Sequence, residues 1–218
     1  WQADPAVKLV VMDAEGDRAF CSGGDIAEMY ATGMAGNFAY GKKFWADEYR
    51  LNATIFGYPK PVVSFLQGFT MGGGVGIGCH GSHRIVGDTS QIAMPEVGIG
   101  LVPDVGGTLM LALAPERLGE YLGTTASRMN ASDAIFAGFA DIYIPEGKWP
   151  ELIAQLETTG DTACLTPENP AEIGPIQSQM PEITKHFHGV GLSDVLTTLE
   201  SDDSEFAQKT LKQLRRNS

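Results

Sequence analysis

Apolar residues along the chain fall first into short continuous runs bounded by turn residues. Runs of this length, rich in β-branched side chains, are typical of buried strands. They occur at residues 7–14, 62–66, 84–86, 91–94 and 141–144. We therefore expect strands in these five places.

Other apolar residues recur with the spacing of a helix face. This spacing predicts helices from Ile26 onward and at 42–56, 75–79, 109–113, 116–122, 132–138, 149–156 and 193–216. The aromatic residues of 42–56 are interpreted as core. Small residues at 31–40 predict a loop, and the Thr, Pro, Gly and Asn of 158–180 predict a linker or lid.

Strands followed by glycine turns and then by helices indicate an α/β fold. The change in composition after residue 145 predicts a core at 1–145, followed by a linker and helical extension at 146–218. The chain opens on Trp1, and a strand candidate follows within a few residues. We therefore expect a fragment of a longer polypeptide.

Charge and cysteine content narrow the choice of partners and compartment. The formal charge of −12 opposes nucleic acid and anionic membrane surfaces as partners, and no apolar run is long enough to span a bilayer. The three cysteines are widely separated and form no CxxC pair, which favours a reducing compartment.

Two glycine turns and two acidic residues form the most informative constellation. Gly24 and Gly73 lie in turns between strand and helix candidates, where free backbone N–H groups can stabilise an oxyanion. Glu96 and Asp104 lie in apolar loops eight residues apart and can serve as a general base or bind a hydroxyl group. Together they predict an active site.

Other kinds of site are disfavoured. The GxGxxG of Gly76, Gly78 and Gly81 does not directly follow a strand and leaves no room for the helix of a dinucleotide site. His80 and His83 lack a third metal ligand, so we predict no metal. The chain contains neither the GxSxG of serine hydrolases nor a phosphate-binding GxxxxGK[ST] loop.

The chain resembles the crotonase (enoyl-CoA hydratase/isomerase) superfamily. The resemblance lies in AFCSGGDI, KPVVSFLQGFTMGGGVG, IAMPEVGIGLVPDVGG, RLGEYLGTT and DAIFAGFADIYIP. It implies a spiral of ββα units that binds an acyl-CoA substrate, with no further cofactor. The N–H groups of Gly24 and Gly73 would form the oxyanion hole. Substrate-binding positions would be Gly23, Asp25, Gly72 and Gly76.

Within that superfamily, hydratases carry two catalytic glutamates. The first of the two positions is Gly76 here and the second is Glu96, which argues against a hydration that uses both. The phrase MPEVGIGLVPDVGG and the tail from 173 to 218 resemble the 3-hydroxyisobutyryl-CoA hydrolases of valine catabolism. In that branch Glu96 would assist attack on the thioester, and Asp104 would position the 3-hydroxyl group or water.

Two other functions stay open. One is an enoyl-CoA hydratase or isomerase, and the other is a non-catalytic scaffold that binds CoA. The resemblance also implies a homo-oligomer, a trimer or hexamer. It implies a cytoplasmic location if the source is bacterial, or the mitochondrial matrix if it is eukaryotic.

Overall fold

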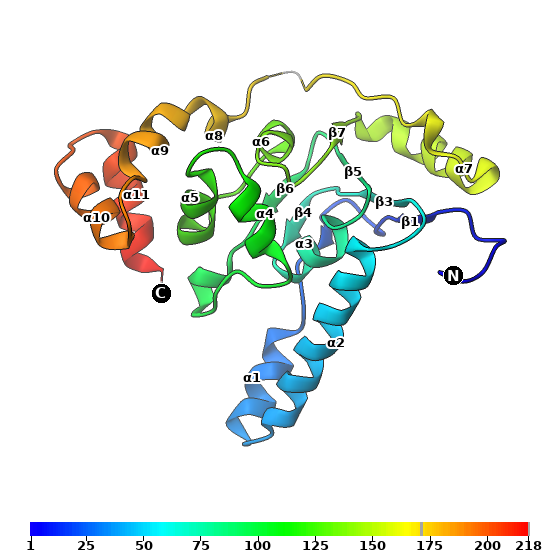
Figure 1. Ribbon diagram of the computed structural model, residues 1–218, viewed down its shortest axis with the longest axis horizontal. Helices are drawn as coiled ribbons and strands as arrows, with labels where there is room; N and C mark the ends of the chain where they lie inside the picture. The colour runs from blue at the N-terminus through cyan, green and yellow to red at the C-terminus, as the bar shows by residue number, and fades with distance from the viewer. Residues whose placement is uncertain (171, 218) are drawn as a thin grey trace.

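A computed structural model describes residues 1–170 and 172–217. Consecutive strands of this part alternate between two parallel sheets (Figure 1). The four-stranded sheet has the order β1 (Val10–Met12), β3 (Val62–Phe65), β5 (His83–Val86) and β7 (Ile142–Tyr143). The three-stranded sheet has the order β2 (Ala19–Cys21), β4 (Phe69–Met71) and β6 (Gln91–Ala93).

Each turn of the chain adds one strand to each sheet and then a helix. The register shows this repeat: Val11 pairs with Val63, and Val63 pairs with His83. In the second sheet, Thr70 pairs with Ile92. Parallel neighbours require crossover connections, and here the crossovers carry the helices. The predicted α/β fold of ββα units is confirmed.

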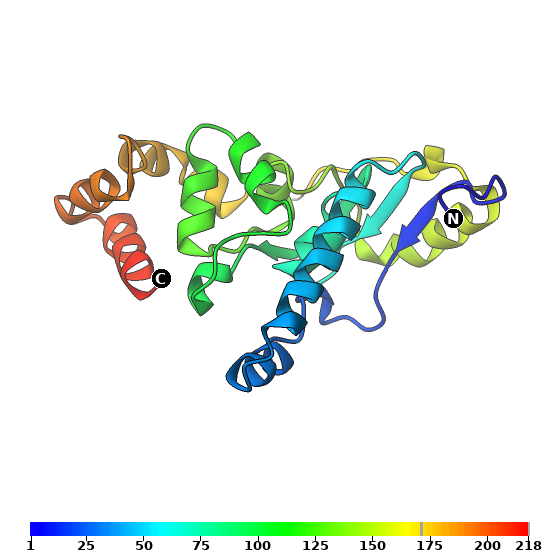
Figure 2. The ribbon, with the colours of Figure 1, turned by 60° about the horizontal axis from the view of Figure 1, so that its bottom comes forward.

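The first crossover consists of α1 (Ile26–Met34) and α2 (Phe38–Phe56). The two helices form an antiparallel pair that projects from the body of the molecule (Figures 1 and 2). The loop predicted at 31–40 is therefore wrong, because only residues 35–37 separate the helices. Alanine between the glycines favours helix, and Asn37 stands at the N-cap position of α2.

Short helices follow the later strands. They are α3 (Gly73–Gly78), the 3₁₀ turn η1 (Glu96–Ile99), α4 (Gly107–Leu113), α5 (Leu118–Thr125) and α6 (Ala131–Phe136). Beyond β7 lie η2 (Glu146–Lys148), α7 (Trp149–Thr159), η3 (Thr162–Cys164), α8 (Pro175–Ser178), α9 (Met180–His186), α10 (Leu192–Glu200) and α11 (Glu205–Arg216). Among the described residues, no helix is long and apolar enough to cross a membrane.

The predicted linker at 158–180 runs from the end of α7 to the C-terminal helices, with an irregular stretch at 165–170 (Figure 1). It also contains η3, α8 and the last turn of α7, and its residue 171 lies outside the described part. Helix α7 packs on the four-stranded sheet, where Trp149 and Leu156 join Val63 and Phe65 in one buried cluster. Side chains of α9, α10 and α11 join the main core instead. The division at residue 145 stays a prediction.

The sequence pattern missed two strands of the second sheet. β2 and β4 have three residues each and stop directly before the glycine turns at Gly23 and Gly72. Runs this short carry too little alternation to stand out from loops. The strand expected at 7–14 is present but shortened to Val10–Met12.

Candidate active site

The glycine triplet forms the turn from β4 into α3. Gly72 has a φ of 54°, a left-handed conformation that glycine adopts without strain, and α3 begins at the next residue. Gly74 packs so closely on β2 that an added Cβ would lie 2.0 Å from the carbonyl oxygen of Cys21. The triplet therefore joins the two strands tightly and leaves the start of α3 accessible.

The turn after β2 lies against this triplet. A Cβ on Gly23 would be 3.1 Å from the amide nitrogen of Gly73, and a Cβ on Gly73 would be 3.6 Å from that of Gly24. Neither the Gly24 nor the Gly73 N–H donates a hydrogen bond to any described residue. The structure thus brings together the two glycines that the sequence singled out.

Glu96 follows β6, the neighbour of β4 in the sheet, and begins η1. It is 5% exposed, and its Oε1 lies 2.8 Å from the position of a Cβ on Gly72. Within the described part of the chain, its Oε2 has no hydrogen-bond partner. A buried carboxyl oxygen without a partner is costly for folding, which is typical of a functional position.

Asp104 is held from two sides. The hydroxyl of Tyr49, on α2, donates a hydrogen bond of 2.6 Å to its Oδ2. The next residue, Val105, has a φ of 47°, which is rare for a β-branched residue, and its carbonyl oxygen lies 2.7 Å from Nε2 of His80. Val105 is also buried in the core, so its packing fixes the loop that carries Asp104.

Glu48 adds a third carboxyl group to the site. It precedes Tyr49 on α2 and is half-buried, and its Oε1 lies 2.7 Å from the position of a Cβ on Gly73. Glu48 and Glu96 therefore contact neighbouring glycines of one turn.

The pKa values of Glu96 and Glu48 are both raised. Burial, and secondarily the charges of Asp104 and Glu48, raises the pKa of Glu96 from 4.5 to about 7. Burial and the Asp104 charge also raise the pKa of Glu48, and burial together with Asp104 raises that of Tyr49. Among the described residues, the cavity lining contains no lysine, arginine or histidine to offset these charges.

These groups surround a small cavity of about 90 Å³. Six of the eight predicted site residues line it: Gly23, Gly24, Gly72, Gly73, Glu96 and Asp104. The other two are outside the lining. Asp25 caps α1 by accepting hydrogen bonds from the N–H groups of Ala27 and Glu28, and Gly76 packs against Asn52 and Val105.

The sequence reasoning missed the contribution of α2. Phe44, Trp45 and Glu48 line the cavity, and Tyr49 reaches Asp104. The interpretation of the aromatic residues at 42–56 as core is wrong, because Asn52 is the buried residue of α2 and Tyr49 and Phe56 are 43% and 65% exposed. The sequence signal for this contribution was the carboxylate of Glu48 on the same helix face as Phe44 and Trp45. A carboxylate among large apolar side chains is unusual for a purely structural face.

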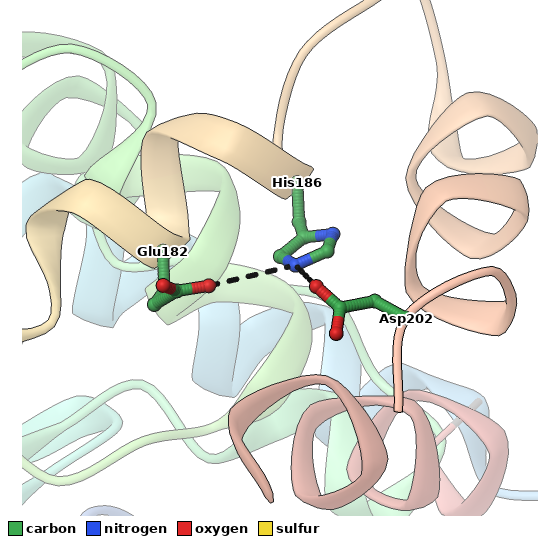
Figure 3. A group of neighbouring side chains, drawn as sticks. All are labelled: Glu182, His186 and Asp202. Atoms are coloured by element: carbon green, nitrogen blue, oxygen red, sulfur yellow. Dashed lines mark ion pairs between the residues drawn. The ribbon is translucent and has the colours of Figure 1, made fainter. Parts of the chain in front are cut away.

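A second polar cluster lies far from this cavity in sequence. Glu182 and His186 of α9 meet Asp202, which precedes α11 (Figure 3). Nε2 of the buried His186 is 3.0 Å from Oδ2 of Asp202, and Lys185 Nζ is 2.5 Å from the same oxygen. These side chains offer three ligand atoms within 4.8 Å of one another, but the ammonium group already neutralises Asp202 and holds its pKa well below the usual range. We interpret the cluster as an ion-pair network that connects the C-terminal helices.

Two parallel sheets built from alternating strands, with a glycine turn opening α3, define a crotonase-type α/β fold. The family model described as enoyl-CoA hydratase/isomerase matches residues 1–218. The chain belongs to this family.

Curated relatives include proteins named 3-hydroxyisobutyryl-CoA hydrolase. The mitochondrial protein of Xenopus tropicalis is 35% identical over 229 residues, which cover 98% of this chain and 58% of that protein. The mitochondrial protein of Danio rerio is 34% identical over 100% of this chain and 60% of its own length. The chain thus spans less than two thirds of these relatives.

Solved structures with the same fold carry different names. A protein of Rhodobacter sphaeroides described as an enoyl-CoA hydratase is 56% identical with a TM-score of 0.95, covering 100% of this chain and 64% of its own. A protein of Mycobacterium thermoresistibile described as a carnitinyl-CoA dehydratase is 40% identical with a TM-score of 0.94 and the same coverage. The fold and family are therefore consistent across both comparisons, whereas the named activities differ.

Proposed function

We propose that this chain belongs to a thioester hydrolase that acts on 3-hydroxyisobutyryl-CoA or a similar short 3-hydroxyacyl-CoA. The observation that carries the proposal is the position of Glu96, a buried carboxyl group beside the turn that brings Gly24 and Gly73 together. The names of the curated relatives, at 32% to 39% identity, support the same activity.

In the proposed reaction, the thioester carbonyl oxygen accepts hydrogen bonds from the N–H groups of Gly24 and Gly73. Glu96 takes a proton from a water molecule as the water oxygen attacks the carbonyl carbon. Negative charge develops on the carbonyl oxygen, where a single N–H donor contributes about 3 to 4 kcal/mol of barrier lowering. The carbon–sulfur bond then breaks, and the CoA thiolate takes up a proton.

Glu96 has a second route to the same products. Its carboxylate oxygen can attack the carbonyl carbon directly, which forms an anhydride and releases CoA. Water then hydrolyses the anhydride. Both routes use the same oxyanion donors, and in both Asp104 positions a hydroxyl group or water. The remaining predicted contacts to substrate are Gly23, Asp25, Gly72 and Gly76, of which Gly23 and Gly72 border the cavity.

An enoyl-CoA hydratase or isomerase is the second candidate, and one observation favours it. The 56% identical structure from Rhodobacter sphaeroides is described as an enoyl-CoA hydratase. The packing at Gly76 argues against a hydratase that uses two glutamates. A Cβ at this position would lie 2.7 Å from Val105 Cβ and 2.9 Å from Asn52 Nδ2. A glutamate has no room there.

The test uses the intact protein with (S)-3-hydroxyisobutyryl-CoA and, separately, crotonyl-CoA. Free thiol and enoyl absorbance are followed together. The hydrolase proposal predicts thiol release from the hydroxyacyl thioester. Loss of enoyl absorbance without thiol would support the second candidate instead. No thiol release and no loss of enoyl absorbance, in a protein that still binds CoA, would indicate a non-catalytic scaffold.

We further propose that the protein works as a homo-oligomer, a trimer or hexamer. The tip of the α1–α2 pair exposes large apolar side chains, with Tyr30 69%, Met34 72% and Phe38 67% exposed. A bacterial protein of this kind would be cytoplasmic, and a eukaryotic one would be in the mitochondrial matrix.

A further inference from the structure

The loop between η1 and α4, which carries Asp104, has a strained backbone. Val105 has a φ of 47° and Gly106 a φ of 77°, so the two residues directly after Asp104 are both left-handed. A β-branched residue avoids this conformation and keeps it only where surrounding contacts hold it. Val105 is 2% exposed, and its Cβ packs against Gly76 of α3. The side chain of Val105 therefore provides one of these contacts.

His80 provides a second contact, through the backbone. It follows Cys79, the C-cap residue of α3, and its Nε2 lies 2.7 Å from the carbonyl oxygen of Val105. Because a carbonyl oxygen can only accept a hydrogen bond, Nε2 carries the proton and donates it. A Cβ added to Gly106 would lie 2.6 Å from the same nitrogen. One imidazole ring thus contacts both left-handed residues.

The ring of His80 is itself held by α2. Phe56, the last residue of that helix, meets the ring edge-on, with the ring centroids 6.0 Å apart and the planes at 87°. Tyr49, on the same helix, donates a hydrogen bond to the carboxylate of Asp104. Helix α2 therefore supports the side chain of Asp104 directly, and it supports the backbone after Asp104 by way of His80.

His80 acts from outside the active cavity. Asp104 and Val105 line that cavity, whereas His80 lines a separate cavity of about 340 Å³. Helix α3 begins at Gly73 and ends at Gly78, two residues before His80. The hydrogen bond to Val105 therefore ties the Asp104 loop to the same short helix that presents the N–H group of Gly73.

We propose that His80 is a positioning residue, which fixes Asp104 relative to the N–H group of Gly73 through its hydrogen bond to Val105. This inference rests on the proposed function above, in which Asp104 positions the 3-hydroxyl group or a water molecule. Without the hydrogen bond, the left-handed loop loses one of its restraints and Asp104 can move out of place. A small displacement of a positioning group slows the chemical step.

The experiment measures kcat for thiol release from (S)-3-hydroxyisobutyryl-CoA by the intact protein and by three variants of His80. In His80→Gln, the amide nitrogen is as many bonds from the backbone as Nε2 and can still donate to Val105. In His80→Asn the amide nitrogen is one bond closer to the backbone and falls short, and in His80→Leu a side chain of similar bulk has no donor. Circular dichroism establishes that each variant is folded.

The matched control is His83→Leu. His83 is a histidine three residues further on, its Nδ1 is 2.9 Å from the hydroxyl of Ser82, and it is outside the lining of both cavities. This variant should keep the wild-type kcat.

We expect kcat to fall about 10-fold in His80→Leu and His80→Asn, and to stay within about 3-fold of the wild type in His80→Gln. A ring that served only to fill space would give a different pattern, in which leucine keeps the activity. An unchanged kcat in a folded His80→Leu protein, or a His80→Gln protein as slow as His80→Asn, would overturn the inference.

Backbone hydrogen exchange separates this inference from the proposed function, because it does not depend on turnover. The N–H of Gly107 donates a hydrogen bond of 2.6 Å to the carbonyl of Asp104, so its protection reports on the loop. If the wild type releases no thiol but exchange at 101–107 is faster in His80→Leu and His80→Asn and not in His80→Gln, the proposed function fails and the inference stands. If exchange there is unchanged in all three variants, the inference fails whether or not thiol is released.

Discussion

Glu96 should destabilise the folded protein at neutral and alkaline pH, and its replacement by glutamine should remove that effect. The carboxyl group is 5% exposed, one of its oxygens has no partner among the described residues, and two other carboxyl groups lie nearby. Glutamine keeps the shape of the side chain and cannot ionise.

The magnitude follows from the pKa. Its rise from 4.5 to about 7 corresponds to about 3 kcal/mol at about 1.4 kcal/mol per unit. Between these two values the folded protein binds more protons than the unfolded chain, so the unfolding free energy falls as pH rises from 4.5 to about 7. Glu96→Gln should therefore gain up to about 3 kcal/mol relative to wild type above pH 7, and the relative gain should vanish toward pH 4.5.

Urea unfolding at a series of pH values measures this difference. Taking the variant minus the wild type cancels the titration of all other groups. Glu157→Gln is the matched control, because Glu157 is an exposed carboxylate of α7 and lies outside the cavity lining. If the Glu96→Gln difference were the same at pH 5 and pH 8, the carboxyl group would not be in the environment described above.

Three further predictions concern the glycine turn, the hydrogen bond to Asp104 and an ion pair beside the four-stranded sheet. Gly74→Ala should lower the melting temperature strongly or prevent folding, because its Cβ would be 2.0 Å from a carbonyl oxygen of β2; Gly147→Ala, with open space around it, should not. Tyr49→Phe removes the hydrogen bond to Asp104 and should slow thiol release about 10-fold with little change in urea unfolding, whereas equal loss of activity and stability would contradict a local role. Arg84→Met should cost about 2 to 3 kcal/mol in urea unfolding, because Arg84 pairs with Asp141 and donates to the carbonyl of Gly138; a change below about 0.5 kcal/mol would show that these bonds contribute little.

Much of the fold was predictable because its turns, helix starts and longer strands are determined by residues close together in the sequence. The starts of α1 and α6 illustrate this, because Asp25 and Asn130 directly precede the two helices and their side chains accept hydrogen bonds from backbone N–H groups of the first turn. The strands β2 and β4 were not predictable, since three residues give no periodicity to recognise. They exist because the second sheet pairs them with each other.

The candidate site was predictable only in part, for a similar reason. Glycines and carboxylates in unusual turns are visible along the chain, which identified Gly24, Gly73, Glu96 and Asp104. Glu48 and Tyr49 look like ordinary helix residues in sequence and become informative only when α2 packs on α3 and on the Asp104 loop. The positions of Glu48 and Tyr49 in the site depend on tertiary contacts between residues far apart in the sequence. Tyr49 and Asp104, for example, are 55 positions apart.

The central claim is that Glu96 drives hydrolysis of a short 3-hydroxyacyl thioester. The most direct measurement is thiol release from (S)-3-hydroxyisobutyryl-CoA by the wild type and by Glu96→Gln across pH 5 to 9. We expect the wild-type rate to rise through a pKa of about 7, as the carboxylate forms, and the folded variant to be slower by about 100- to 10,000-fold. Thiol release by Glu96→Gln at the wild-type rate, with an unchanged pH profile, would contradict the account.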